Sequence, residues 1–169
     1  FFVLSGFLIT SLLLVEWRTH RRISLRAFWG RRFRRLLPAV LVLIAGTGAI
    51  AWFWLPPGEM PGQGRDMLAS LGYVMNWNLI AGDQSYFDPT LRPPLLQHLW
   101  SLAIEEQYYL LWPLLVIACI RLMGLRGLLL FAVLGAIGSW WLMATLYVPG
   151  ADPSRVYFGT DTRAGGLML

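Results

Sequence analysis

The stretch LLPAVLVLIAGTGAIAWFWL, residues 36–55, runs for 20 residues without a charged side chain. An α-helix rises about 1.5 Å per residue, so a helix of this length crosses a hydrocarbon layer of roughly 30 Å. The sequence Pro56-Pro57-Gly58 follows directly and breaks a helix, because proline lacks a backbone donor and glycine adds backbone freedom. Residues 36–55 therefore predict a transmembrane helix.

The composition of the whole chain agrees with a membrane protein. Of its 169 residues, 57% are hydrophobic and 14% are charged, whereas roughly 25% charged residues is typical of soluble domains. Four further segments are apolar enough to be transmembrane helices or parts of them. They are residues 1–15 (partial), 98–120, 128–148 and 158–169 (partial). We therefore expect an all-α fold, a polytopic transmembrane helical bundle. The single cysteine, Cys119, excludes an internal disulfide.

The distribution of positive charge predicts the orientation of this bundle. All 14 basic residues are arginines, and eight of them lie between Arg18 and Arg35. Short cytoplasmic loops are enriched in arginine and lysine, so we expect the Arg18–Arg35 loop to be cytoplasmic. Both ends of the chain fall within apolar runs, and Phe1 is not an initiator methionine. We therefore interpret residues 1–169 as part of a membrane domain that is truncated at both ends.

Residues 67–82 are less clearly transmembrane, because the segment is short and contains Asn76 and Asn78. A re-entrant helix, an interfacial helix and a short transmembrane helix all fit this pattern. If the segment does not cross, residues 98–120 return inward and Arg121 becomes cytoplasmic, which the charge rule favours. We therefore expect a re-entrant or interfacial helix here.

The arginine-rich segment SLRAFWGRRFRRLLP, residues 24–38, leads into the first predicted transmembrane helix. A spacing of three places Arg32 and Arg35 on one helical face, with Arg31 and Arg34 beside it. Planar guanidinium groups suit bidentate contacts with phosphate. The alternative interpretation is an anchor for lipid headgroups that also sets the topology, which explains any arginine-rich cytoplasmic loop.

The segment HLWSLAIEEQYYLLWP, residues 98–113, carries carboxylates within an apolar helix. Carboxylates at membrane depth are costly, so we expect Glu105 to face the bundle interior, neutralised or paired with an arginine. The alternative is that Glu105 and Glu106 lie at the headgroup boundary, where they cost little. A serine-histidine-acid triad is disfavoured, because three residues on one helix rarely converge on one reacting atom. The polar stripe itself comprises His98, Ser101, Glu105, Tyr108 or Tyr109, and Trp112.

Two further segments carry polar or small residues next to apolar runs. The sequence YFGTDTRA, residues 157–164, predicts a helix start with Thr160 or Asp161 as N-cap and an ion pair between Asp161 and Arg163. Small residues near the start of the chain allow helices to approach closely in lipid. These small residues are Ser5, Gly6 and Thr10.

Taken together and in order, these segments resemble the membrane-embedded acyltransferase 3 family of bacteria. The matching segments are FFVLSGFLIT (1–10), SLRAFWGRRFRRLLPA (24–39), SYFDP (85–89) followed by HLWSLAIEEQYYLLWP (98–113), and YFGTDTRAGGLML (157–169). The resemblance covers the whole chain. It implies a multi-pass helical protein of the inner membrane that moves an acyl group, commonly acetyl from acetyl-CoA, to a hydroxyl of a cell-envelope saccharide or a similar acceptor.

The resemblance also implies roles for individual residues. Arg32 and Arg35 match a paired arginine motif and would bind the phosphates of acyl-CoA, the donor substrate. The family motif Ser-Leu-x-x-Glu-Glu-Gln-Phe-Tyr falls on Ser101 through Tyr109, with a tyrosine at the phenylalanine position. Within it, Glu105 would support catalysis, while Ser101 and Tyr109 would bind the substrate.

An Asp-Thr-Arg motif of the family falls on Asp161 and Arg163, which would orient the acceptor hydroxyl or hold the site together. The small or acidic residues that commonly follow this motif are replaced by Gly165 and Gly166. No metal site and no nucleic-acid partner is predicted.

The general base implied by the resemblance is a histidine in a membrane helix upstream of the segment 1–10. Imidazole suits the deprotonation of a hydroxyl because its pKa lies near neutrality. Neither His20 nor His98 matches it by position. We therefore expect the 169 residues by themselves not to catalyse turnover.

Two other functions fit the same residues. A transporter or flippase for a lipid-linked or anionic substrate would line its pathway with Glu105 and Arg163. A membrane sensor or scaffold without catalytic activity would tolerate the removal of both side chains.

Overall fold

The computed structural model describes residues 1–88, 90 and 92–169, and within them every regular element is a helix. This confirms the all-α class. Pro89 of the segment SYFDP lies outside the described residues. The elements are α1 (Phe2–His20), α2 (Leu25–Trp54), the short 3-10 helix η1 (Pro57–Glu59), α3 (Met60–Leu71), α4 (Met75–Ala81), α5 (Leu99–Leu146), α6 (Ser154–Phe158) and α7 (Thr160–Met168).

Three helices, α1, α2 and α5, are long and apolar enough to cross a membrane. Their outer surfaces remain strongly apolar: Trp52 is 76% exposed and Leu122 is 82% exposed. Large exposed hydrophobic surfaces are unfavourable in water but match the hydrocarbon layer of a bilayer. The structure therefore supports a membrane protein, whereas the predicted limits of each membrane segment stay predictions.

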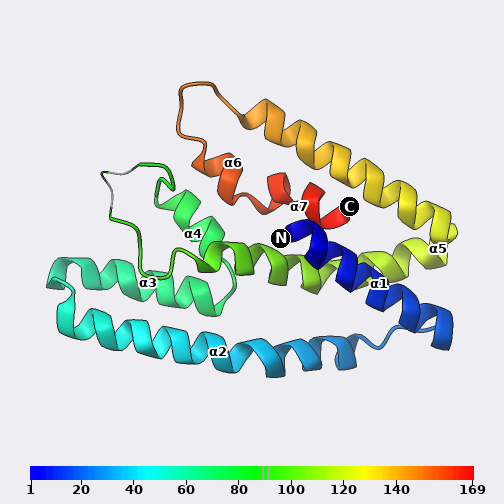
Figure 1. Cartoon of the computed structure of the whole chain (residues 1–169), viewed down its shortest axis with the longest axis horizontal. Helices are drawn as coiled ribbons and strands as arrows, with labels where there is room; N and C mark the ends of the chain where they lie inside the picture. The colour runs from blue at the N-terminus through cyan, green and yellow to red at the C-terminus, as the bar shows by residue number, and fades with distance from the viewer. Residues whose placement is uncertain (89, 91) are drawn as a thin grey trace.

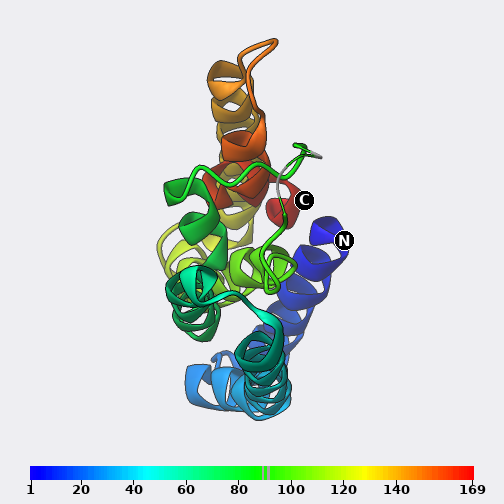
Figure 2. The same ribbon diagram turned by 90° about the vertical axis from the view of Figure 1, so that its left-hand side faces the viewer.

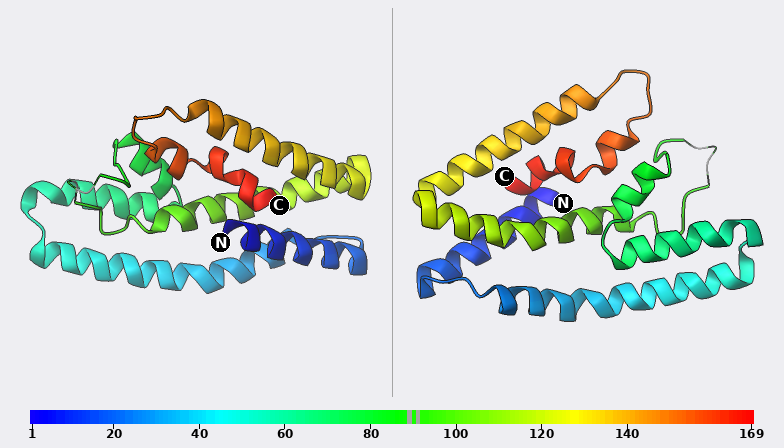
Figure 3. Two further views of the ribbon diagram at one scale, coloured as in Figure 1. Left: turned by 45° about the horizontal axis from the view of Figure 1, so that its top comes forward. Right: turned by 180° about the vertical axis from the view of Figure 1, so that it is seen from behind.

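Helix α5 is bent sharply at Gly124, where the backbone has φ 72° and ψ −172°. Glycine adopts this combination readily, whereas residues with a Cβ atom do not. The two predicted segments 98–120 and 128–148 therefore form the two arms of α5. In Figure 1 the second arm returns above the first, and Figure 3 shows α6 and α7 between the arms.

Residues 67–82 form the end of α3, a turn and α4, rather than one continuous helix. The turn contains Tyr73 with φ 53°. Helix α3 packs antiparallel to α2 (Figure 1), and α4 packs against the first arm of α5. Figure 2 shows α2 and the second arm of α5 at opposite edges of the molecule. Whether residues 67–82 are interfacial or re-entrant remains a prediction.

The core lies where α1 and α7 meet the first arm of α5. Trp112 and Leu167 are each 1% exposed there. Gly6 of α1 lies so close to α7 that a Cβ atom would collide with the Leu167 carbonyl oxygen. The indole Nε1 of Trp112 donates a hydrogen bond of 2.8 Å to Thr10. These contacts confirm that the small residues of α1 allow close helix packing.

Candidate functional site

Three consecutive residues of α5 connect it to four other helices. Successive residues of an α-helix point about 100° apart, so adjacent side chains face different partners. Glu105 accepts a hydrogen bond from the Ser5 hydroxyl of α1. Glu106 forms an ion pair with Arg32 of α2, with 3.6 Å between Oε1 and Nη2. Gln107 faces α4 and α7. This part of α5 therefore organises the polar interior of the molecule.

A cavity of about 620 Å³ lies between α1, α2 and α5. We call it the arginine cavity. Its volume is within the range of small-molecule and cofactor sites. One side is apolar and is formed mostly by α1 residues such as Leu8 and Leu12. The polar residues of its wall are Ser5, Arg31, Arg32, Arg35, Glu105, Glu106 and Tyr109.

Arg32 is enclosed by its neighbours on α5. Its guanidinium carbon lies 3.5 Å from the centre of the Tyr109 ring, in cation–π contact. Its charge is offset by Glu106, and both side chains are largely buried, at 24% and 14% exposure. Arg32 Nε and Glu106 Oε1 make no hydrogen bond within the described part of the chain. Arg32 therefore forms part of the inner wall of the cavity, held by Tyr109 and Glu106.

Arg31 and Arg35 line the same cavity but are exposed at its opening. Among the residues that the structure describes, neither has a carboxylate partner. They are four residues apart and thus neighbours on one face of α2. Arg34 does not line the cavity, and its Nε donates to the Gly30 carbonyl at 3.1 Å. The arginines of the cavity are therefore Arg31, Arg32 and Arg35; the sequence-based assignment included the last two.

The predicted substrate-binding residues separate in the structure. Tyr109 lines the arginine cavity, whereas Ser101 does not, and its hydroxyl faces the His98 carbonyl at 3.4 Å. Glu105 is 7% exposed and lines the cavity, as expected for a carboxylate facing the interior. Neither His20 nor His98 lies on the wall of this cavity.

The predicted ion pair between Asp161 and Arg163 is wrong. Asp161 instead pairs with Arg155 of α6, with 2.7 Å between Oδ2 and Nη2. Arg163 donates from Nε to the Tyr157 carbonyl at 3.0 Å. The helix is interrupted at Gly159, which lies between α6 and α7 and is the N-cap of α7 in place of the predicted Thr160 or Asp161. Residues two apart on a helix point away from each other, so Asp161 and Arg163 face different neighbours.

Asp161 and Arg163 lie outside the arginine cavity, and so does Gln107, which connects α7 to α5. The Thr160 hydroxyl donates to Gln107 Oε1 at 2.6 Å. Gln107 Nε2 donates to Asn76 Oδ1 at 3.0 Å, and Asn76 Nδ2 donates to the Thr160 hydroxyl at 2.9 Å. This closed network joins α4, α5 and α7. This network was not predicted from the sequence, although an asparagine within an apolar segment indicates a need for a hydrogen-bonding partner.

The fold and the site therefore define the class of the protein: it is a helical membrane protein with a cationic cavity between its long helices. Residues 1–159 match a family described as an acyltransferase domain. The chain belongs to this family, as the resemblance of its motifs predicted.

Curated relatives cover the whole chain. It is 48% identical over 170 residues to the peptidoglycan O-acetyltransferase OatA of Listeria monocytogenes, which covers 99% of the chain and 27% of that relative. It is 44% identical to the putative peptidoglycan O-acetyltransferase YrhL of Bacillus subtilis, over 100% of the chain and 27% of the relative. A putative O-acetyltransferase of Staphylococcus aureus (strain COL) is 45% identical, over 100% of the chain and 28% of the relative.

The chain thus spans about a quarter of the length of these relatives. No solved structure matches it.

Proposed function

We propose that the protein transfers an acyl group, in the first instance acetyl, from acyl-CoA to a hydroxyl of a cell-envelope saccharide. The chain belongs to an acyltransferase family, and two of its relatives are named for peptidoglycan O-acetylation. In this proposal the protein lies in the bacterial inner membrane, with the Arg18–Arg35 loop on the cytoplasmic side, where acyl-CoA is present.

The observation that carries the proposal is the pair of exposed arginines at the opening of the arginine cavity. Arg31 and Arg35 lack a carboxylate partner in the described residues, so their guanidinium groups are available to phosphate. Coenzyme A carries several phosphate oxygens and therefore suits this opening. Arg32 differs from them, because Glu106 already offsets its charge.

The interior of the cavity suits the reacting end of the donor. The acceptor hydroxyl attacks the thioester carbonyl, the new C–O bond forms, the C–S bond breaks, and the hydroxyl proton ends on the departing thiol. Glu105 is held by Ser5 at the cavity wall, beside Tyr109, and would orient the hydroxyl. We assign the general base to none of these residues. Asp161 and Arg163 lie outside the cavity and would act by holding α6 and α7 in place.

The experiment compares charge reversals of three arginines on α2 in the protein as its gene encodes it. Arg31→Glu and Arg35→Glu should each raise the apparent KM for acetyl-CoA about tenfold or more, because each removes a charge-assisted hydrogen bond. Arg34→Glu is the matched control, since it changes the charge of the loop equally but lies outside the cavity. Initial rates of acetyl transfer in membrane vesicles give these constants.

Equal effects of all three substitutions would contradict the proposal and would indicate that the arginine cluster only sets the topology of the protein in the membrane. Movement of substrate across the membrane without consumption of acetyl-CoA would instead support the transporter alternative.

A further inference from the structure

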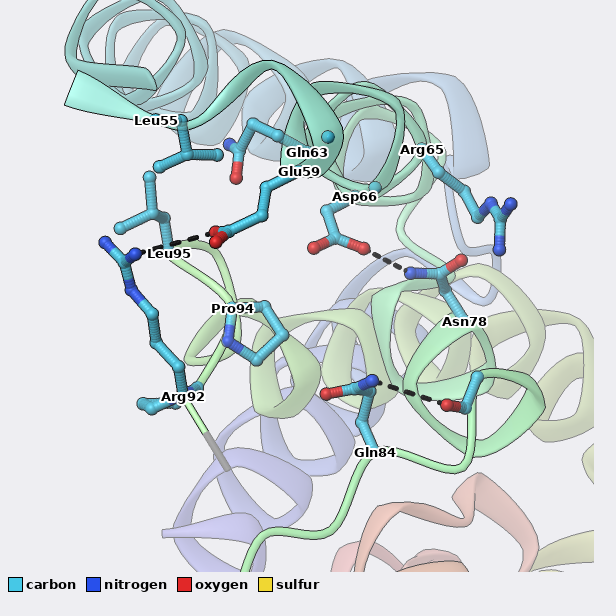
Figure 4. A pocket seen from close by; sticks show the side chains of 14 residues that line it. Leu55, Glu59, Gln63, Arg65, Asp66, Asn78, Gln84, Arg92, Pro94 and Leu95 are labelled. Atoms are coloured by element: carbon cyan, nitrogen blue, oxygen red, sulfur yellow. Dashed lines mark hydrogen bonds and ion pairs between the residues drawn. The ribbon is translucent and has the colours of Figure 1, made fainter. Parts of the chain in front are cut away.

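The cavity in Figure 4, of about 400 Å³, lies between α3, α4 and the segment 92–95. Both of its carboxylates have partners in the cavity wall. Glu59 and Arg92 lie 3.5 Å apart, and Asp66 Oδ1 accepts a hydrogen bond of 2.6 Å from Asn78. A groove near the opposite end of the molecule differs from this cavity. Within the described residues, the one charged side chain of the groove has no carboxylate partner.

This groove, of about 310 Å³, lies between α1 and the two arms of α5, beside the end of α7. We call it the α1 groove. Its volume is at the lower end of the range for small-molecule sites. Phe7 and Leu129 line it and are 58% and 67% exposed, so the groove is open to the surroundings of the protein. Its wall is mostly apolar and includes Phe7, Leu14, Leu125, Leu128, Leu129 and Ala132.

The α1 groove and the arginine cavity lie on different faces of α1. Ser5 and Leu12 line the arginine cavity. The α1 residues that line the groove follow one another at spacings of four, three and four, which keeps them on one helical face. A ligand in the groove would therefore support α1 from a side that does not face the arginine cavity. These groove residues are Phe7, Ser11, Leu14 and Arg18.

Arg18 gives the end of the α1 groove a positive charge. Glu16, the nearest carboxylate in the sequence, accepts a hydrogen bond of 2.8 Å from the Ser24 backbone amide instead. Arg121 and Arg126 flank the bend of α5, and Figure 1 shows this bend at the same end of the molecule as the end of α1. All three arginines are exposed. This end of the groove therefore favours an anion.

The length of the α1 groove matches one leaflet of a bilayer. Arg18 follows Phe7 by 11 residues in the sequence. Eleven residues are about 16 Å of helix, and half of a hydrocarbon layer of roughly 30 Å is about 15 Å. With Arg18 at the membrane surface, an acyl chain laid along α1 would reach the middle of the membrane near Phe7.

We infer that the α1 groove binds one anionic phospholipid, with the phosphate at Arg18 and one acyl chain along α1. Guanidinium groups form charge-assisted hydrogen bonds with phosphate, and basic sites between membrane helices suit anionic headgroups. A zwitterionic lipid fits less well, because its amine would face three arginines. The cytoplasmic leaflet follows from the proposed orientation of the protein. The lipid takes no part in acyl transfer, so the inference goes beyond the proposed function.

The test measures lipid binding by the protein as its gene encodes it, purified in detergent. Native mass spectrometry gives the Kd of phosphatidylglycerol, which is anionic, and of phosphatidylcholine with the same acyl chains, which is zwitterionic. We expect the unchanged protein to bind phosphatidylglycerol more tightly. Arg18→Gln should raise the Kd of phosphatidylglycerol about tenfold or more, because a charge-assisted hydrogen bond is lost.

Arg22→Gln is the matched control for Arg18→Gln. It removes the same charge from an exposed position four residues away, but Arg22 does not line the α1 groove. The Kd of phosphatidylglycerol should therefore stay nearly unchanged in this variant.

A second variant tests the position of the acyl chain. Ala132→Phe places a ring in the α1 groove without changing a charge, and it should also weaken the binding of phosphatidylglycerol. The unfolding midpoint without added lipid shows whether this variant is folded. If it is not, Ser11→Phe fills the same groove from α1. Glycerol 3-phosphate has the phosphate but no acyl chain, and it should not displace the lipid.

Four results would overturn the inference. They are equal affinity for the two lipids, an equal Kd for Arg18→Gln and Arg22→Gln, displacement of the lipid by glycerol 3-phosphate, and an unchanged Kd in a folded variant with a filled groove. The last result is also the one expected if another helix of the protein occupies the groove.

Discussion

At the scale of single residues, Arg32 occupies the most constrained position of the site. Its guanidinium group stacks on Tyr109 and faces Glu106 at 3.6 Å. A planar cation can make both contacts at once, whereas the ammonium group of lysine is a point charge. Arg32 therefore serves the structure of the cavity wall, while Arg31 and Arg35 are available to a ligand.

We predict that the contributions of Arg32 and Glu106 to the stability of the protein depend on each other. Arg32→Gln or Glu106→Gln alone leaves one largely buried charge unpaired, at a cost of about 3 kcal/mol. The double variant removes both charges and should be more stable than either single variant. The unfolding midpoint in detergent measures this difference. Additive losses in the double variant would show that the two side chains act independently.

At the scale of elements, the sharp bend at Gly124 gives α5 its shape. The bend turns the second arm back alongside the first, so that Ser139 contacts α7. The Ser139 hydroxyl donates a hydrogen bond to the Asp161 carbonyl at 2.6 Å and accepts one from the Gly165 amide at 2.9 Å. Pro113 lies within the first arm without ending the helix. The position of α7 thus depends on one backbone conformation between two apolar segments.

We predict that Gly124→Ala destabilises the protein by about 1–3 kcal/mol, because alanine is strained at φ 72°. No atom lies within 4 Å of the added Cβ atom, so the cost is conformational and not a collision. Gly138→Ala, in the second arm, is the control: it also has open space and should leave stability unchanged or slightly higher. Thermal unfolding of both variants in detergent checks this. Equal midpoints would contradict the role of the bend.

At the scale of the whole molecule, α2 runs from the arginine cavity to η1 and α3 at its far end. If α2 crosses the membrane as its 30 residues allow, its two ends lie on opposite sides. The charge rule places the arginine end in the cytoplasm.

We predict opposite accessibility for the two ends of α2. In a Cys119→Ser background, Arg22→Cys should react with a membrane-impermeant maleimide only from the cytoplasmic side. Gly58→Cys should react only from the outer side, and both positions are exposed in the structure. Labelling of intact cells and of inverted vesicles distinguishes these cases. Reaction of both cysteines from one side would show that α2 does not cross.

The sequence by itself determined the helical class, the positions of the long apolar segments and the concentration of arginines before residue 36. These features follow from local composition. An uncharged run of 20 residues indicates a transmembrane helix whatever other helices it contacts. The order of motifs such as residues 98–113 also sufficed to indicate the family, because motif matching does not depend on the partners that each residue meets.

Only the tertiary structure decided which groups meet. Helical periodicity placed Arg32 and Arg35 on one face, but the rotation of α2 against α5 determined that only Arg32 is offset by Glu106. Asp161 and Arg163 are close in sequence, yet the break in the helix at Gly159 brings Asp161 to Arg155 instead. The physical reason is that a side chain's partners depend on how separate helices pack, and one helix's own periodicity does not fix that packing.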